Sequence, residues 1–185
     1  MTDETAPPAE DLDALIRRVD NDRWLATRFV ADPEQRADLI ALYAFDYELA
    51  RAGQVTSTPL LAEIRLTWWR EALDEVYGGG PVRYHPAAAA LAQAIQRRNL
   101  PRELLEAMID SRIDELESGP VASKAESPVV HAAAMLLDSA TPPHFTARQL
   151  SAEAFPAVLP LAIGHIRNPV LKRLRLVWSV ATGRI

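Results

Sequence analysis

Apolar residues along this chain recur at helical spacing, and no stretch shows the strict alternation of a half-buried strand. Helix starts recur as a polar residue followed by proline: Asp32-Pro33, Thr58-Pro59, Ser127-Pro128 and Asn168-Pro169. In each pair the first side chain can cap a helix, and proline fits the first turn, where no N–H is needed. Glycines close two of the predicted helices, at Gly53 and at 78–80. We therefore expect an all-α protein of about seven or eight helices.

The segment "IRLTWWREALDEVY", residues 64–77, holds most of the large aromatic side chains in the middle of the chain. On a helix, Leu66, Trp69 and Leu73 share one face, whereas Ile64 and Trp68 share another. Two apolar faces predict a helix that is covered on more than one side, near the middle of a bundle.

The domain organisation follows from a change in composition. Residues 1–8 are predicted to form a disordered tail, and 9–185 a single helical domain. Within that domain, 118–146 contains "SGPVASKAESP" and "SATPPHF" on either side of a short alanine-rich helix at about 128–138. These small, polar, proline-rich stretches indicate a linker-like or trimmed region.

Composition and charge exclude several classes of function. A net charge of −5 argues against nucleic acid as a partner. The absence of cysteine excludes disulfides, thiolate zinc sites and cysteine nucleophiles. The first thirteen residues carry five acids and no base, the reverse of a secretory or mitochondrial leader, so we expect a cytoplasmic protein.

Residues that could hold a metal are sparse. The histidines never stand four residues apart, so no metal site is expected among His85, His131, His144 and His165. Asp110 and Asp114 stand one helical turn apart and could share Mg²⁺ with a facing helix. The alternative is a solvated face with ion pairs one turn apart, as expected for Arg70 and Asp74.

The C-terminal segment is locally basic. From 165 to 185 it carries five Lys or Arg and no acid. Ile166, Val170, Leu174 and Val177 form an apolar stripe, which we expect to dock on the bundle. The basic face suits an anionic membrane surface or an acidic partner, although a helix simply docked on the bundle fits as well. The candidate contact residues are Arg167, Lys172, Arg173, Arg175 and Trp178.

Several stretches resemble the squalene/phytoene synthase family in the order in which that family carries them. Its first half is matched by "DRWLATRFVADPEQRADLIALYAF", "EIRLTWWREALDEVYGG", "HPAAAALAQAI" and "LPRELLEAMIDSRIDEL", and its end by "FPAVLPLAIGHIR" and "LKRLRLVWSVATGRI". The resemblance implies a helical bundle like a truncated isoprenoid synthase fold. Catalytic members join two prenyl diphosphates head to head, using Mg²⁺ held by two aspartate-rich motifs.

The chain departs from that family at the metal motifs. The Tyr-x-Phe before the first motif matches Tyr43 and Phe45, and the family's arginine falls on Tyr47. The two metal-facing aspartates fall on Ala50 and Gln54, and the second motif has no counterpart. Ala50 cannot ligate a hard cation, and Gln54 offers one amide oxygen. The resemblance therefore implies no catalytic residue, no metal site and no cofactor.

An aspartate-less branch of the family, which includes a mitochondrial assembly factor for respiratory complex I, is the part this chain resembles. We therefore expect a non-catalytic assembly or interaction factor at the cytoplasmic membrane face, with a protein partner or an isoprenoid lipid. The alternative is a Mg²⁺-dependent prenyltransferase whose acids come from Asp110, Asp114 or a partner. The candidate pocket residues are Tyr43, Phe45, Tyr47, Trp69, Asp110 and Asp114.

Overall fold

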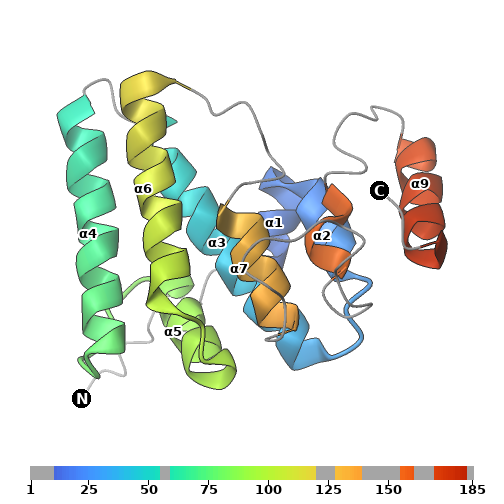
Figure 1. Cartoon of the computed structure of the whole chain (residues 1–185), viewed down its shortest axis with the longest axis horizontal. Coiled ribbons are helices and arrows are strands. Elements are labelled where there is room, and N and C mark those ends of the chain that lie inside the picture. The colour runs from blue at the N-terminus through green and yellow to red at the C-terminus, as the bar shows by residue number, and fades with distance from the viewer. Residues whose placement is uncertain (1–10, 55–58, 120–127, 139–154, 161–168, 183–185) are drawn as a thin grey trace, which may run out of the picture.

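The computed structural model describes residues 11–54, 59–119, 128–138, 155–160 and 169–182. All regular elements in these ranges are helices, which confirms the all-α prediction. In chain order they are α1 (Leu12–Val19), α2 (Asn21–Thr27), α3 (Pro33–Gln54), α4 (Pro59–Tyr77), α5 (Pro86–Arg98), α6 (Arg102–Ser118), α7 (Pro128–Leu137), the 3-10 helix η2 (Phe155–Ala157) and α9 (Pro169–Thr182) (Figure 1).

The proline signals set the helix starts. Helices α3, α4, α7 and α9 each begin at the proline of a predicted pair. At the start of α3, the carboxylate of Asp32 accepts a hydrogen bond from the N–H of Glu34 at 3.0 Å. After the C-terminal end of α4, Gly79 adopts φ +71°, a conformation that glycine reaches without strain. Local sequence signals therefore fix where these helices begin and end.

Helix α3 runs through the centre of the bundle and contacts α1, α4, α5, α6 and α7 (Figure 1). Its buried apolar side chains point in several directions around the helix axis. They include Leu39, Ile40, Leu42, Tyr43, Phe45 and Leu49. Any side chain on α3 is therefore placed by packing against several neighbouring helices.

Helix α4 lies at the edge of the bundle, and its expected central position was wrong (Figure 1). It packs on α3 and α6, where Leu66, Trp69 and Leu73 are buried. Among the described helices none covers Ile64 on its second apolar face, and Ile64 is 55% exposed. One apolar face of α4 is therefore buried in the bundle, whereas Ile64 on the other face is exposed to solvent.

Helix α7 lies inside the stretch interpreted as linker-like, yet it is part of the core. Its apolar side chains are buried between α3 and α6, among them Val129, Val130 and Leu136. The side-chain amide of Gln35 donates to the carbonyl of Leu137 at 2.8 Å and ties the end of α7 to α3. The predicted tail at 1–8 and the flanks at 120–127 and 139–154 lie outside the described residues.

A buried ion cluster joins α3 to the end of α5. Asp38 is completely buried, and its carboxylate accepts hydrogen bonds from Nε of Arg97 at 3.0 Å and Nε of Arg98 at 2.8 Å. Both arginines lie in the last turn of α5, where cations also favour the helix dipole. Because the carboxylate is out of solvent, these two partners offset the cost of burying it.

Replacing Asp38 with alanine should lower the free energy of unfolding by about 3 kcal/mol, because both guanidinium groups lose a buried carboxylate. Urea unfolding followed by tryptophan fluorescence measures the change. The control is Glu34→Ala, whose carboxylate is 60% exposed and lies 3.9 Å from Arg97 and 3.5 Å from Arg98. That variant should lose less than about 1 kcal/mol. Equal losses would contradict the central role of Asp38.

Candidate functional site

The face of α3 that carries Ala50 opens into a pocket of about 210 Å³. Helices α4 and α6 supply its other walls. The lining residues are Leu49, Ala50, Gly53, Leu66, Arg112, Glu115 and Leu116. Ala50 therefore lies in a pocket wall, at the position where the resemblance places a metal ligand in catalytic relatives. The side chain of Gln54 is outside the described part of the structure.

Asp46, one turn before Ala50, is held by two arginines from other helices. It is only 5% exposed. Its two carboxylate oxygens accept hydrogen bonds from Nη1 of Arg23 at 2.6 Å and Nη2 of Arg112 at 2.9 Å. Arg23 also lies 3.5 Å from Asp20, and Arg112 lies 2.7 Å from Glu115. The carboxylate is thus enclosed by an ion network that spans α2, α3 and α6.

The ion network keeps Asp46 charged. Burial alone would raise the pKa of Asp46, but the guanidinium groups of Arg23 and Arg112 outweigh it and lower that pKa below its usual range. Burial also disfavours the charged form of Arg23, yet Asp46 and Asp20 raise the pKa of that arginine. A divalent cation approaching Asp46 would meet two guanidinium groups already in place. This side of α3 is therefore built as an ion network.

The aromatic candidates on α3 point in different directions. Tyr43 is 2% exposed, its hydroxyl has no hydrogen-bond partner among the described residues, and burial raises its pKa. The ring of Phe45 meets that of Trp69 edge to face, with centroids 5.2 Å apart. The guanidinium of Arg51 lies 5.6 Å from the ring centroid of Tyr47. These three aromatic residues contribute to packing, and their role in a pocket stays a prediction.

Among the described residues, the acidic candidates on α6 do not form a cluster with acids of another helix. Asp110 accepts a hydrogen bond from Nη2 of Arg70 at 2.5 Å, and its side chain is 59% exposed. The expected pairing of Arg70 with Asp74 is wrong, because Asp74 pairs with Arg102 across the helix interface. Asp114 is exposed. Within the described ranges, no group of three or more potential ligands could hold a metal ion.

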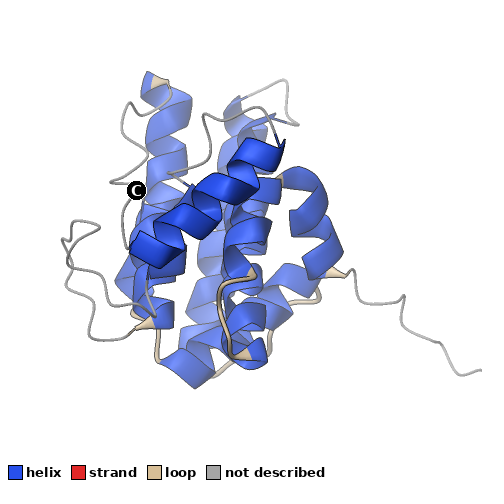
Figure 2. Ribbon diagram, turned by 90° about the vertical axis from the view of Figure 1, so that its right-hand side faces the viewer, coloured by secondary structure: helices blue, strands red, loops and turns tan. Residues whose placement is uncertain are grey.

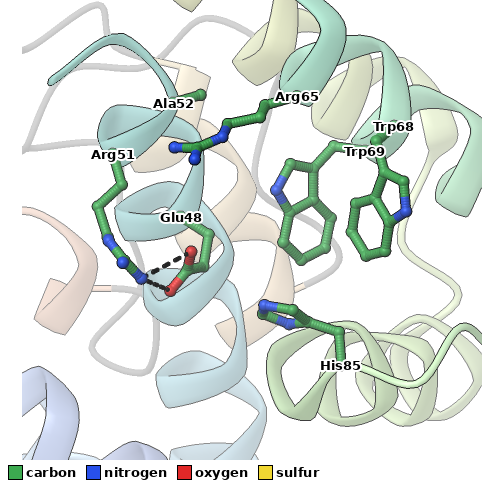
Figure 3. Close-up of a pocket in the computed structure, with 7 residues that line it drawn as sticks. All are labelled: Glu48, Arg51, Ala52, Arg65, Trp68, Trp69 and His85. Carbon is green, nitrogen blue, oxygen red and sulfur yellow. Dashed lines mark hydrogen bonds and ion pairs between the residues drawn. The ribbon is translucent and has the colours of Figure 1, made fainter. Parts of the chain in front are cut away.

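A second pocket, of about 250 Å³, lies between α3, α4 and the start of α5 (Figure 3). Of the predicted residues, only Trp69 lines it. The full lining is Glu48, Arg51, Ala52, Arg65, Trp68, Trp69 and His85. Arg65 stands one helical turn before Trp69, a spacing that puts both side chains on one face of α4. No sequence pattern points to His85, which enters the pocket from the residue before α5.

Helix α9 lies across one side of the bundle (Figure 2). It docks through Leu176 and Ser179, which are buried, and through an ion pair between Lys172 and Asp22 of α2. The expected docking of its apolar stripe is wrong for Leu174 and Val177, which are 60% and 58% exposed. The side chains of Ile166 and Val170 lie outside the described residues. The small Ser179 side chain and the anchored Lys172 bring the opposite face of the helix onto the bundle.

The outward face of α9 is apolar with a basic rim. Leu171 and Trp178 are also exposed on it, and the guanidinium of Arg175 lies 4.3 Å from the ring centroid of Trp178. Arg173 is exposed, whereas Arg167 lies outside the described residues. Among the helices that the structure describes, none is both long and apolar enough to cross a membrane.

Replacing Asp46 with asparagine should destabilise the protein by about 3 kcal/mol near neutral pH, because two arginines lose their shared carboxylate. The lowered pKa means that the charged carboxylate stabilises the fold above its ordinary value of 3.8. This contribution is lost as the pH falls through the lower pKa of the folded protein. The wild-type advantage over the variant should therefore shrink below pH 3.8.

Urea unfolding from about pH 7 down to about pH 3 measures this difference. The matched control is Asp110→Asn, which breaks an exposed pair with Arg70 and should change stability by less than about 1 kcal/mol at any pH. A constant gap between wild type and Asp46→Asn across the range would contradict the linkage.

Comparison with known proteins gives the chain a family. A family model described as squalene/phytoene synthase matches residues 16–127. This match takes in the Asp46 network and both pockets, and it ends before α7.

Curated relatives give a narrower likeness. The NADH dehydrogenase (ubiquinone) complex I assembly factor 6 of Bos taurus is 30% identical over 103 residues, which are 56% of this chain and 30% of the relative. The Homo sapiens protein of that name is 28% identical over the same shares of both chains. The Dictyostelium discoideum homolog is 25% identical over 47% of this chain and 24% of its own length. The chain thus spans a third or less of these relatives.

No solved structure matches the chain. The family assignment comes from the sequence match, and the all-helical fold agrees with what the resemblance implied. Because the family model covers more than half of the chain, the protein belongs to the squalene/phytoene synthase family.

Proposed function

We propose that this protein is a non-catalytic assembly or interaction factor that acts at the cytoplasmic face of a membrane. The observation that carries the proposal is the wall of α3 that holds Ala50 and Asp46. Ala50 offers no ligand, and Asp46 is enclosed by Arg23 and Arg112.

The chemistry of prenyl transfer explains why this wall argues against catalysis. A diphosphate leaving group develops negative charge that catalytic relatives offset with Mg²⁺ held by carboxylates. Here the nearest buried carboxylate on the helix is already neutralised by two guanidinium groups. Those arginines are in turn committed to acids, so neither stands free to replace the metal.

The relatives supply the class of partner. Proteins of several organisms that match this chain are named as assembly factors of complex I. We infer that the partners of this protein are proteins of a respiratory NADH dehydrogenase during its assembly. The net charge of −5 makes nucleic acid an unsuitable partner.

The outward face of α9 supports the membrane part of the proposal. Exposed Leu174, Val177 and Trp178 provide apolar area and an interfacial aromatic ring. Arg173 and Arg175 lie beside them, and each basic residue near an anionic surface contributes about 1 kcal/mol. An apolar face rimmed by bases is the pattern of helices that lie in a membrane interface.

Deleting the gene in its source organism should reduce assembled NADH dehydrogenase in the membrane, because an assembly step loses its factor. Native electrophoresis with an in-gel NADH oxidation stain measures the amount, and succinate dehydrogenase in the same membranes serves as the control. Wild-type protein should restore the complex. An unchanged amount of complex in the deletion strain would remove the basis for the assembly role.

A turnover assay separates the assembly role from the prenyltransferase alternative. The purified protein, incubated with farnesyl or geranylgeranyl diphosphate and Mg²⁺, should form no head-to-head product. Product above background that disappears with EDTA would favour the enzyme and overturn the non-catalytic assignment.

The purified protein should sediment with vesicles containing anionic lipid and much less with neutral vesicles, because the basic rim of α9 faces outward. The double variant Arg173→Gln and Arg175→Gln should weaken this binding at least about tenfold at low salt. Raising the salt should weaken wild-type binding in the same direction.

The matched control removes two bases elsewhere, by Arg17→Gln and Arg18→Gln on α1, which are also exposed. A third variant, Leu174→Ser with Val177→Ser, tests the apolar part of the face. Equal losses in the α1 and α9 double variants would show that only overall charge matters. Equal sedimentation with both lipids would leave α9 without a membrane role.

A further inference from the structure

The pocket lined by Trp68, Trp69 and Arg65 lies on the side of α3 opposite the wall that carries Ala50. Its α3 residues are Glu48, Arg51 and Ala52, whereas Leu49, Ala50 and Gly53 line the other pocket. At 3.6 residues per turn these two sets point to opposite sides of the helix. The two pockets share no lining residue. The site is therefore separate from the wall of α3 that carries Ala50.

The polar groups of this pocket are mainly hydrogen-bond donors. Arg51 is paired with Glu48 at 3.0 Å, which leaves Arg65 as the second guanidinium of the pocket. Arg65 is exposed and has no acidic partner in the part of the chain that the structure describes. With two arginines and one glutamate, the lining carries a net charge of about +1 when the histidine is neutral. Figure 3 shows the guanidinium of Arg65 directed into the space between Trp69 and Arg51.

One further polar atom of the pocket lining has no hydrogen-bond partner among the described residues. Nδ1 of His85 is buried and makes no hydrogen bond. Trp69 is 4% exposed, and its indole nitrogen lies on the side of the ring nearer Arg65 (Figure 3). A buried polar atom without a partner is unfavourable, so Nδ1 of His85 is stabilised when a polar ligand group reaches it.

The apolar wall of the pocket is rigid. The rings of Trp68 and Trp69 meet edge to face with centroids 4.9 Å apart, and the ring of His85 lies 5.0 Å from that of Trp69. Behind this wall, the guanidinium of Arg83 lies 5.1 Å from the ring centroid of Trp68 and binds Glu71 and Glu75. Because this wall is held in place from behind, a ligand does not have to order it.

We propose that this pocket binds a small organic anion, with a carboxylate or phosphate group attached to a flat or branched apolar body. The anionic group pairs with Arg65 and reaches Arg51 and the indole N–H of Trp69, since a guanidinium fork suits both kinds of oxyanion. The apolar body packs on Trp68 and Trp69. The volume of about 250 Å³ is below the range of about 300–1,000 Å³ that holds drug-sized ligands, so the ligand is small.

Isothermal titration with phenylacetate, phenyl phosphate and the uncharged phenylacetamide tests this site. At least one of the two anions should bind at least about tenfold more tightly than the amide, because only an anion engages Arg65 with full charge. The tighter of the two identifies the headgroup. Acetate alone should bind more weakly than phenylacetate, because it lacks the ring that packs on the tryptophans.

Two variants locate the binding. Arg65→Gln should weaken the bound anion about tenfold, and since Arg65 is exposed and unpaired in the described structure the fold is retained. Trp68→Leu should weaken phenylacetate and leave acetate unchanged. The matched control is Arg173→Gln on α9, which removes an equal charge outside the pocket.

The proposal is overturned if neither anion binds more tightly than phenylacetamide, or if no saturable binding occurs below about 10 mM. It is also overturned if Arg65→Gln and Arg173→Gln bind the anion equally. Neither result bears on the assembly role, which rests on the opposite wall of α3.

Discussion

The arrangement of α2, α3 and α6, and the proposed non-catalytic function, both depend on the hydrogen bonds from Arg23 and Arg112 to Asp46. They join α2 and α6 to the middle of α3 at a site out of solvent. A charge buried there is tolerated only with partners in good geometry, so the network fixes how the three helices sit together. It also fills, with cations, the place beside Ala50 where a metal-dependent relative needs anions. The same ion network therefore stabilises the fold and supports the proposal that the protein is non-catalytic.

The same helix presents a different electrostatic environment on its other side. Around Asp46 every guanidinium is balanced by acids, whereas the pocket beside Trp69 has Arg65 without an acidic partner in the described residues. An unpaired cation beside a rigid aromatic wall favours an anion from outside the chain. The central position of α3 lets one helix carry a structural ion network on one face and an open, donor-rich pocket on the other.

Local signals predicted the helices, and contacts distant in sequence could not be predicted. Pro33, Pro59, Pro128 and Pro169 begin helices because capping depends on neighbouring residues. Periodicity shows which face of a helix is apolar but not what covers that face. The predicted central position of α4 and the predicted docking of the apolar stripe of α9 were therefore wrong. The partners of Asp46 lie 23 and 66 residues away in the chain, and no spacing rule reaches that far.

The orientation of α9 bears on the proposed membrane role. A helix normally buries its apolar side, because exposing it to water forfeits about 25 cal/mol for each Å². Here an ion pair to Asp22 and the buried Leu176 and Ser179 hold the other side against the bundle. The exposed leucines, valines and Trp178 are therefore stabilised only when something covers them. Since Arg173 and Arg175 lie at the rim, that surface favours a negatively charged binding partner. An anionic bilayer offers both negatively charged headgroups and an apolar interior.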